Sequence, residues 1–437
     1  MNSSDNIIKS IFAAAILTLA ICTAQAGKPG SAAAAADSSA VGSAAVAADS
    51  LVGSPAPVID FPLSEASSVA VVVRDLRTGS DIVSQNPRKA MIPASTMKCV
   101  TAAAAIVAGI DNDRFRTDVY LQGPVTDSIL HGNIVVNGIG DPTIESGQFP
   151  ETPGFVSEIV LRVKERGIKV IQGDILVDDS GLPNSGPNER WELSDVKYDY
   201  GAGLFALNFR DNKHADKAMK DPAEEFGDAL EEALARQDII VLWDGEKFDN
   251  EADMEKILTH ESPNCGKILR NMIVRSDNLF AEGILRKLAP GGTLKTALSR
   301  ERQLLANKGL AFGIEDLYDG SGLSRNNRVT ADFMASLLTM MADEKGRKVS
   351  YVSLFPRCGM EGTVKQLLKG SDLEGKVVLK SGSMNGVHCY SGYKLDDNDK
   401  PTHAIVILVN DFFCKRADVR SAIDRFLRET FIENQDD

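Results

Sequence analysis

Side chains that commonly bind transition metals are scarce in this sequence. Its 437 residues include five His and six Cys, with no H-E-x-x-H motif and no Cys/His pair at zinc spacing. We therefore expect no metal site built by the protein, and nothing indicates another cofactor. Excess positive charge is missing too, since the formal net charge is -13. An acidic surface argues against nucleic acid or anionic lipid as the main partner.

The sequence also lacks a hydrophobic run long enough to cross a bilayer comfortably. The N-terminal run, residues 11–21, follows Lys9 and precedes Ala24-Gln25-Ala26, which fits the A-x-A cleavage pattern. Residues 1–26 are thus predicted to be a secretory signal peptide, and the protein to be secreted and periplasmic, with at most peripheral membrane association. Lipidation at Cys22 is disfavoured because Ile21 is bulky where a small residue is expected.

Cleavage of the signal peptide would leave five cysteines, an odd number: Cys99, Cys265, Cys358, Cys389 and Cys414. At least one of them must stay free even in an oxidising compartment. Most are expected to be buried single thiols that act as small hydrophobic side chains. A Cys389–Cys414 disulfide is one pairing that the sequence leaves open.

Composition divides the chain into segments. Residues 27–59 are dominated by Ala, Ser and Gly and are predicted to be a flexible linker. Residues 60–117 and 258–437 are predicted to form one domain, and residues 118–257 a mainly β inserted domain. Short β-like runs in the insert alternate with turns and with two predicted helices, 155–166 and 223–237.

The main domain is predicted to be α/β in class, with an α+β arrangement. Strand patterns near residues 69–73 and 82–83 open it, and patterns at 377–395 and 404–409 close it. Residues 264–288 are predicted to be helical, and a last helix places Val419, Ile423, Phe426 and Leu427 on one face. Strands at both ends with helices between them imply an antiparallel sheet flanked by helices.

The richest chemical pattern is Pro93-Ala94-Ser95-Thr96-Met97-Lys98, which runs into an Ala-rich helical segment. If a helix begins near Ser95, the Ser95 hydroxyl and the Lys98 amine lie on one face, within reach of each other. A serine hydroxyl needs a neighbouring base to become a nucleophile. By itself S-x-x-K is weak, since roughly one or two copies are expected by chance, and Ser194-Asp195-Val196-Lys197 is a second copy here.

Two further motifs follow in order, Ser276-Asp277-Asn278 and Lys380-Ser381-Gly382. The ordered triple resembles that of penicillin-binding proteins and class A β-lactamases. In such a site Ser95 would be acylated and Lys98 would accept its proton. Ser276 would pass a proton to the leaving amine, and Asn278 would bind the substrate amide and steady Lys98.

The third motif would bind the substrate. Lys380 and the Ser381 hydroxyl would attract a terminal carboxylate, and Gly382 would let the substrate backbone lie close to the strand edge. The backbone N–H groups of Ser95 and Ser383 would hold the oxyanion.

The chain resembles the DacB-type D-alanyl-D-alanine carboxypeptidase/endopeptidase family, the low-molecular-mass class C penicillin-binding proteins. The resemblance covers roughly residues 65–430 and rests on these stretches: 93–98, 140–142, 191–212, 275–282, 319–325 and 386–393. It implies a periplasmic serine peptidase that acts on peptidoglycan stem peptides and is acylated by β-lactams. It also implies an acidic residue of the insert that reads the diamino-acid side chain, for which Asp178 matches best; a turn carboxylate is an equal alternative.

The sequence departs from the family pattern at three places. Only residues 213–220 separate Asn212 from Asp221, so a small subdomain is expected to be absent. Ser381 replaces the more usual Thr and keeps the hydroxyl. His388 stands where the family commonly has Arg, and a neutral His would weaken binding of the substrate carboxylate.

Two alternative functions stay open at this point. A β-lactamase would turn over its acyl-enzyme rapidly instead of keeping a persistent penicillin label. A non-catalytic peptidoglycan-binding protein on the same fold would leave peptidoglycan fragments intact. The oligomeric state is not indicated by the sequence.

Overall fold

The computed structural model describes residues 67–242, 254–342 and 350–432. The predicted signal peptide and linker lie outside these residues. No helix in the described part of the chain is long and apolar enough to cross a membrane.

A five-stranded antiparallel sheet with the order β13-β14-β15-β1-β2 organises the first part of the structure. It joins the two ends of the chain, because β1 pairs with β15 from Ser68↔Asn410 to Asp75↔His403. The strands are β1 (Ser68–Asp75), β2 (Asp81–Gln85), β13 (Val377–Met384), β14 (Val387–Leu395) and β15 (Pro401–Asn410). This arrangement confirms the predicted antiparallel sheet.

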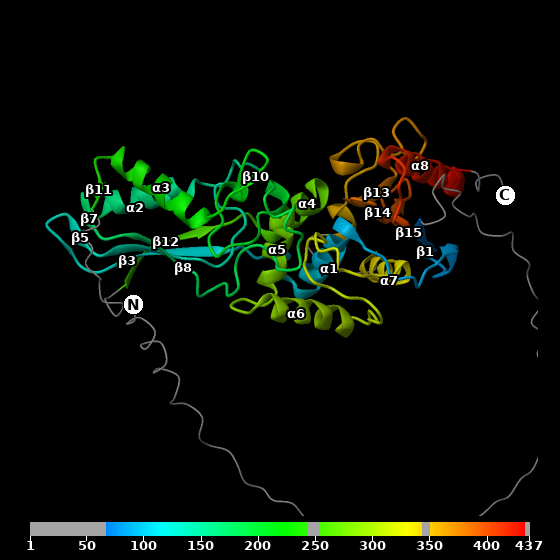
Figure 1. Cartoon of the computed structure of the whole chain (residues 1–437), viewed down its shortest axis with the longest axis horizontal. Coiled ribbons are helices and arrows are strands. Elements are labelled where there is room, and N and C mark those ends of the chain that lie inside the picture. The colour runs from blue at the N-terminus through cyan, green and yellow to red at the C-terminus, as the bar shows by residue number, and fades with distance from the viewer. Residues whose placement is uncertain (1–66, 243–253, 343–349, 433–437) are drawn as a thin grey trace, which may run out of the picture. The chain divides into compact units, whose positions relative to one another are not determined.

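Alternating side chains of this sheet enter two different cores. Val72 and Val406 belong to the core shared with α1, α4, α5, α6 and α7, whereas Val71 and Ile407 face a second core covered by α8. The helices are α1 (Lys98–Ala108), α4 (Cys265–Arg275), α5 (Asn278–Lys287), α6 (Leu294–Asn307), α7 (Ala331–Ala342) and α8 (Arg416–Ile432). Since strand side chains alternate between faces, continuous apolar runs predict a sheet buried on both sides. Figure 1 shows α8 and α7 near β13–β15 and β1.

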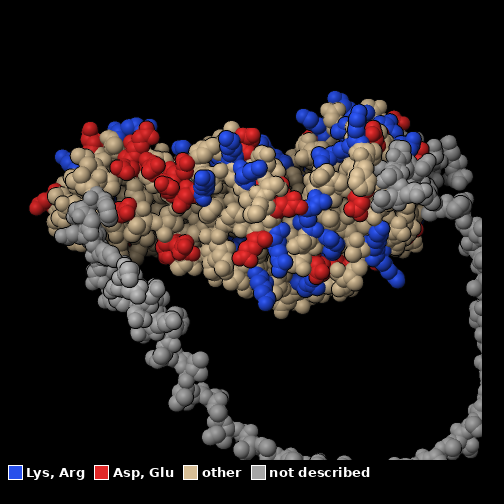
Figure 2. Space-filling model, in the orientation of Figure 1, with Lys and Arg blue, Asp and Glu red and all other residues tan. Residues whose placement is uncertain are grey.

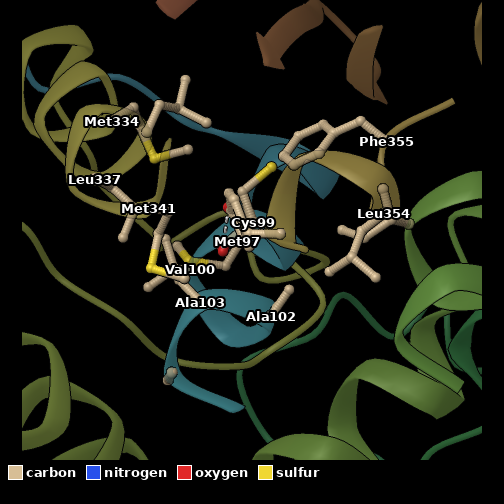
Figure 3. Packing of buried hydrophobic residues seen from close by; sticks show 14 of the residues in the cluster. Met97, Cys99, Val100, Ala102, Ala103, Met334, Leu337, Met341, Leu354 and Phe355 are labelled. Atoms are coloured by element: carbon tan, nitrogen blue, oxygen red, sulfur yellow. Dashed lines mark hydrogen bonds between the residues drawn. The ribbon is translucent and has the colours of Figure 1, made fainter. Parts of the chain in front are cut away.

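Helix α1 is buried on all sides, which is why its sequence is almost entirely apolar. Figure 3 shows its residues packed between α7 and the segment that carries Leu354 and Phe355. The helix ends at Gly109, which adopts the left-handed conformation with φ 76°. Before it, the 3₁₀ turn η1 (Ala94–Met97) carries Ser95, so the α-helix proper begins at Lys98 and not at Ser95.

The predicted continuous helix over 264–288 is wrong at its middle. Ser276 has φ 63° and ends α4, and Asp277 then caps α5 by accepting a hydrogen bond from the Phe280 N–H. Helical periodicity continues across the break, so the apolar pattern gave no sign of it. The break turns the Ser276 side chain out of the helix.

Residues 116–261 contain two further four-stranded sheets with the orders β12-β3-β6-β8 and β11-β7-β5-β4. They share one apolar core with α2 and α3. The elements are β3 (Arg116–Gln122), β4 (Val125–Thr126), β5 (Ile129–His131), β6 (Asn133–Asn137), α2 (Phe155–Glu165), β7 (Val170–Gln172), β8 (Ile175–Asp178), α3 (Pro222–Ala235), β11 (Ile240–Val241) and β12 (Met254–Glu261). The predicted insert limits, 118 and 257, fall inside β3 and β12, and the domain division stays a prediction.

Shorter elements complete the described chain. The segment between Asn212 and Asp221 forms only a small hairpin, β9 (Lys213–His214) and β10 (Lys217–Ala218). The remaining 3₁₀ turns are η2 (Ile110–Asn112), η3 (Asp199–Gly201), η4 (Arg210–Asn212), η5 (Tyr351–Leu354) and η6 (Gly362–Val364). The cysteines at 99, 265, 358, 389 and 414 are all free thiols, so the Cys389–Cys414 disulfide does not form.

Candidate active site

The Lys98 ammonium is the centre of the candidate site. Its Nζ lies 3.0 Å from Ser95 Oγ, 2.6 Å from Asn278 Oδ1 and 2.7 Å from the Ser321 carbonyl oxygen. Lys98 is fully buried, and burial lowers its pKa to about 8. The first two motifs of the sequence therefore meet at one nitrogen atom.

Asn278 is held from both ends of its amide. Its Oδ1 accepts from Lys98, and its Nδ2 donates to the Tyr200 carbonyl oxygen at 2.7 Å. Beside it, the Asp277 carboxylate accepts from Phe280 N–H and from Gln148 Nε2 at 2.6 Å. Contacts from residues 148 and 200 thus fix the start of α5.

The third motif reaches the same place through Ser276. Lys380 Nζ donates to Ser276 Oγ at 2.9 Å and to the Ser381 carbonyl oxygen at 2.6 Å. Lys380 is fully buried, and burial together with the nearby Lys98 charge holds its pKa well below the usual range. Two buried amines beside each other favour the neutral form of at least one.

Gly382 allows β13 to approach the turn that carries Ser95. A Cβ atom at residue 382 would lie 2.7 Å from the Pro93 carbonyl oxygen and 2.9 Å from the Ser95 nitrogen. Only a residue without a side chain fits there. The glycine is therefore required by the packing of β13 against η1, a constraint that the sequence did not indicate.

A cavity of about 280 Å³ opens beside these groups. Its lining residues are Ser95, Ser276, Thr363, Ser381, Ser383, His388, Tyr390, Arg416 and Arg420. A larger cavity of about 820 Å³, lined by Arg286 and Tyr318 among others, does not include Ser95. We place the chemistry in the smaller one, because it contains the serine whose hydroxyl contacts Lys98.

Residues at the cavity wall form a chain of hydroxyl and imidazole contacts. Ser383 Oγ lies 2.7 Å from His388 Nδ1, and His388 Nε2 lies 3.0 Å from the Tyr390 hydroxyl. Burial, with smaller effects of Arg416 and Arg420, lowers the pKa of His388 to about 4. The Ser381 hydroxyl donates to Thr363 Oγ1 at 2.7 Å.

Two other sequence candidates lie elsewhere. Asp178 is exposed at the end of β8 and is absent from the cavity lining, and its carboxylate accepts from the Ser180 N–H within a turn. The second S-x-x-K copy is also exposed at Ser194, and Lys197 lies over the Tyr198 ring.

The site also contains residues to which the sequence gave no role: Ser321, Tyr200, Thr363, Tyr390, Arg416 and Arg420. Ser321 and Tyr200 contribute backbone carbonyl oxygens. Every residue has such an oxygen, so the residue type gave no signal.

Comparison with known proteins gives the family. The model of the D-Ala-D-Ala carboxypeptidase 3 (S13) family matches residues 57–217 and 210–430. The chain belongs to this family. Its members are serine-type D-Ala-D-Ala carboxypeptidases, which confirms the predicted enzyme class.

Individual relatives agree with this assignment. The chain is 24% identical over 406 residues to the D-alanyl-D-alanine carboxypeptidase DacB of Haemophilus influenzae, covering 76% of this chain and 83% of the relative. It is 25% identical to the D-alanyl-D-alanine carboxypeptidase of Actinomadura sp. (strain R39), covering 77% of each chain. The crystal structure of penicillin binding protein 4 (dacB) from Haemophilus influenzae has the same fold, with a TM-score of 0.73 and 22% identity over 84% of this chain and 97% of that one.

Proposed function

We propose that this S13-family enzyme is a D-alanyl-D-alanine carboxypeptidase/endopeptidase that cuts peptidoglycan stem peptides through an acyl-enzyme on Ser95. The main support for this proposal is the 3.0 Å contact between Lys98 Nζ and Ser95 Oγ at the wall of the cavity. A buried amine that contacts a serine hydroxyl is the arrangement that an activated serine nucleophile requires.

Lys98 acts as the base in acylation. It is neutral in an appreciable fraction of molecules near pH 8, because burial lowers its pKa to about that value. The Ser95 oxygen attacks the carbonyl carbon of the penultimate D-Ala while its proton moves to Lys98 Nζ. Asn278 and the Ser321 carbonyl oxygen hold the amine in place throughout.

Ser276 donates a proton to the leaving amine. Its hydroxyl accepts a hydrogen bond from Lys380, so its own proton is free to pass to the departing amine, and the proton that Lys98 took from Ser95 replaces it. The left-handed backbone of Ser276 is unusual for a non-glycine residue and places this side chain at the cavity.

Strand β13 supplies the substrate-binding edge. Its close approach to η1 at Gly382 supports an oxyanion site formed by the N–H groups of Ser95 and Ser383. The Ser381 and Ser383 hydroxyls line the cavity where the C-terminal residue of the substrate would lie. A role for Asp178 in reading the diamino-acid side chain stays a prediction.

β-Lactams are expected to acylate the same serine, since they present a strained amide with a neighbouring carboxylate. One structure of the Haemophilus influenzae penicillin binding protein 4 is a complex with a β-lactam, and it resembles this chain with a TM-score of 0.65. We further infer that residues 1–26 direct the enzyme to the periplasm, where peptidoglycan is found.

Digestion of defined muropeptides tests the proposal. The purified enzyme is incubated with a monomeric pentapeptide muropeptide and with a cross-linked dimer, and the products are weighed by mass spectrometry. Loss of one alanine from the monomer shows carboxypeptidase activity, and conversion of the dimer to monomers shows endopeptidase activity. Intact substrates with the wild type, under conditions where the protein is folded, would overturn the proposal.

A further inference from the structure

The described side chains that line the cavity beside Ser95 include cations but no anions. Of the residues described as lining it, none is Asp or Glu, whereas Arg416 and Arg420 both come from the start of α8. The other side chains at the wall are hydroxyls and one imidazole. A cavity with cations, hydroxyl donors and no carboxylate suits an anionic ligand.

The other cations near Ser95 are poorly placed to bind that anion. Lys98 and Lys380 are fully buried, both are absent from the lining, and their Nζ atoms already contact protein oxygens. His388 shares its two ring nitrogens between Ser383 and Tyr390. Its lowered pKa, about 4, leaves the ring neutral at the pH of most bacterial surroundings.

Helix α8 presents the two arginines in a fixed relation. They are four residues apart and so share one face of the helix, while Val419 and Ile423 anchor the helix in the apolar core under the sheet. Arg416 Nη2 donates to the Met384 carbonyl oxygen at 3.1 Å, which ties it to the end of β13. Arg420 makes no side-chain hydrogen bond or ion pair to any residue in the described ranges. Figure 2 shows Lys and Arg side chains gathered over the region of α8.

We propose that Arg416 and Arg420 bind the carboxylate of the substrate residue that leaves, next to the scissile amide. The inference rests on the proposed function, because a carboxypeptidase cuts the bond that precedes a free C-terminal carboxylate. The planar guanidinium groups can pair with a carboxylate in a bidentate manner. The hydroxyls of Ser383 and of Thr363, which accepts from Ser381, line the same cavity and can add donors. Helix α8 thereby supplies the positive charge that neither Lys380 nor His388 offers to the cavity.

Paired probes test this assignment. The second-order rate of Ser95 acylation is measured for benzylpenicillin and for its methyl ester, which lacks the negative charge. Arg416→Gln, Arg420→Gln and the double variant are compared with wild type. Arg425→Gln is the matched control, because Arg425 is an exposed arginine of the same helix that does not line the cavity.

The expected result is a loss of about 10- to 100-fold for the acid in each cavity variant, with little change for the ester. Arg→Lys variants, which keep the charge, should recover part of the loss, and their melting curves should match the wild type. An acid-to-ester ratio that is unchanged in the double variant would overturn the inference. Failure of wild-type protein to react with either probe would instead reject the proposed function.

Discussion

The Nζ of Lys98 and the Oδ1 of Asn278 lie 2.6 Å apart although 180 positions separate the two residues in the chain. The partner of the amine is a neutral amide, not a carboxylate. A hydrogen bond of this kind orients the amine without adding the opposite charge that would raise its pKa. The arrangement suits a lysine that must give up its proton near neutral pH.

Acylation should therefore depend on pH through Lys98. Because the neutral amine is the active form and its pKa is about 8, the acylation rate should rise ~10-fold per pH unit below pH 8 and level off above it. Asn278→Asp places a carboxylate beside the amine, raises the pKa of Lys98 and should move the rise to higher pH. Stopped-flow labelling with a fluorescent penicillin across pH 5 to about 10 measures both profiles. Identical midpoints in the two proteins would contradict this role of Lys98.

Substitutions at Ser276 should change stability and activity independently. Its φ of 63° is costly for a residue with a side chain, so Ser276→Gly should leave the free energy of unfolding unchanged or raise it by about 1 kcal/mol. Turnover should fall about 100-fold or more because the proton donor to the leaving amine is lost. Ser276→Ala should lose as much turnover without the gain in stability. Chemical denaturation and peptide hydrolysis give the two quantities, and full activity in the Gly variant would rule out proton transfer by this hydroxyl.

Gly382 should tolerate no side chain. A methyl group there meets the Pro93 carbonyl oxygen at 2.7 Å, so Gly382→Ala must push β13 away from the Ser95 turn. A displacement of this kind should slow acylation by about 100-fold. Gly227→Ala is the control, because in α3 a Cβ atom meets nothing within 4 Å and alanine should stabilise the helix by about 0.5–1 kcal/mol. Equal acylation rates in the two variants would show that the close contact is unimportant.

Asp319 links several loops around Lys98. Its two carboxylate oxygens accept from Gly322 N–H, Ser324 N–H, Asn327 Nδ2 and Trp191 Nε1, all in a fully buried setting. Asp319→Ala leaves these donors unpaired and should cost about 3 kcal/mol of unfolding free energy. Trp191→Phe removes a single donor and, apart from packing changes, should cost less. Urea denaturation compares them, and near-equal midpoints for wild type and Asp319→Ala would refute this role.

The sequence predicted the sheet and the chemical groups of the site because both follow from residue type. Continuous apolar strands at the two ends of the chain predicted a buried antiparallel sheet, and β1 does pair with β15. The spacing of Ser95 and Lys98 predicted their contact, and the structure places them 3.0 Å apart. The Ser95–Lys98 spacing is a local pattern. Burial of the sheet on both faces shows directly in the apolar composition of its strands.

Other features depend on tertiary contacts that no local pattern records. The break at Ser276 interrupts a helical pattern whose apolar periodicity does not change. The need for glycine at 382 arises from the packing of β13 against the turn before α1. Arg416 and Arg420 belong to no motif, since their place at the cavity follows from how α8 packs on the sheet.

Peptide mapping of the protein after incubation with benzylpenicillin identifies the acylated residue directly. We predict a single adduct with the mass of intact penicillin, located on the peptide that contains Ser95, and no adduct in Ser95→Ala. A penicillin adduct on another residue, or none on folded wild-type protein, would contradict the assignment of Ser95 as the nucleophile.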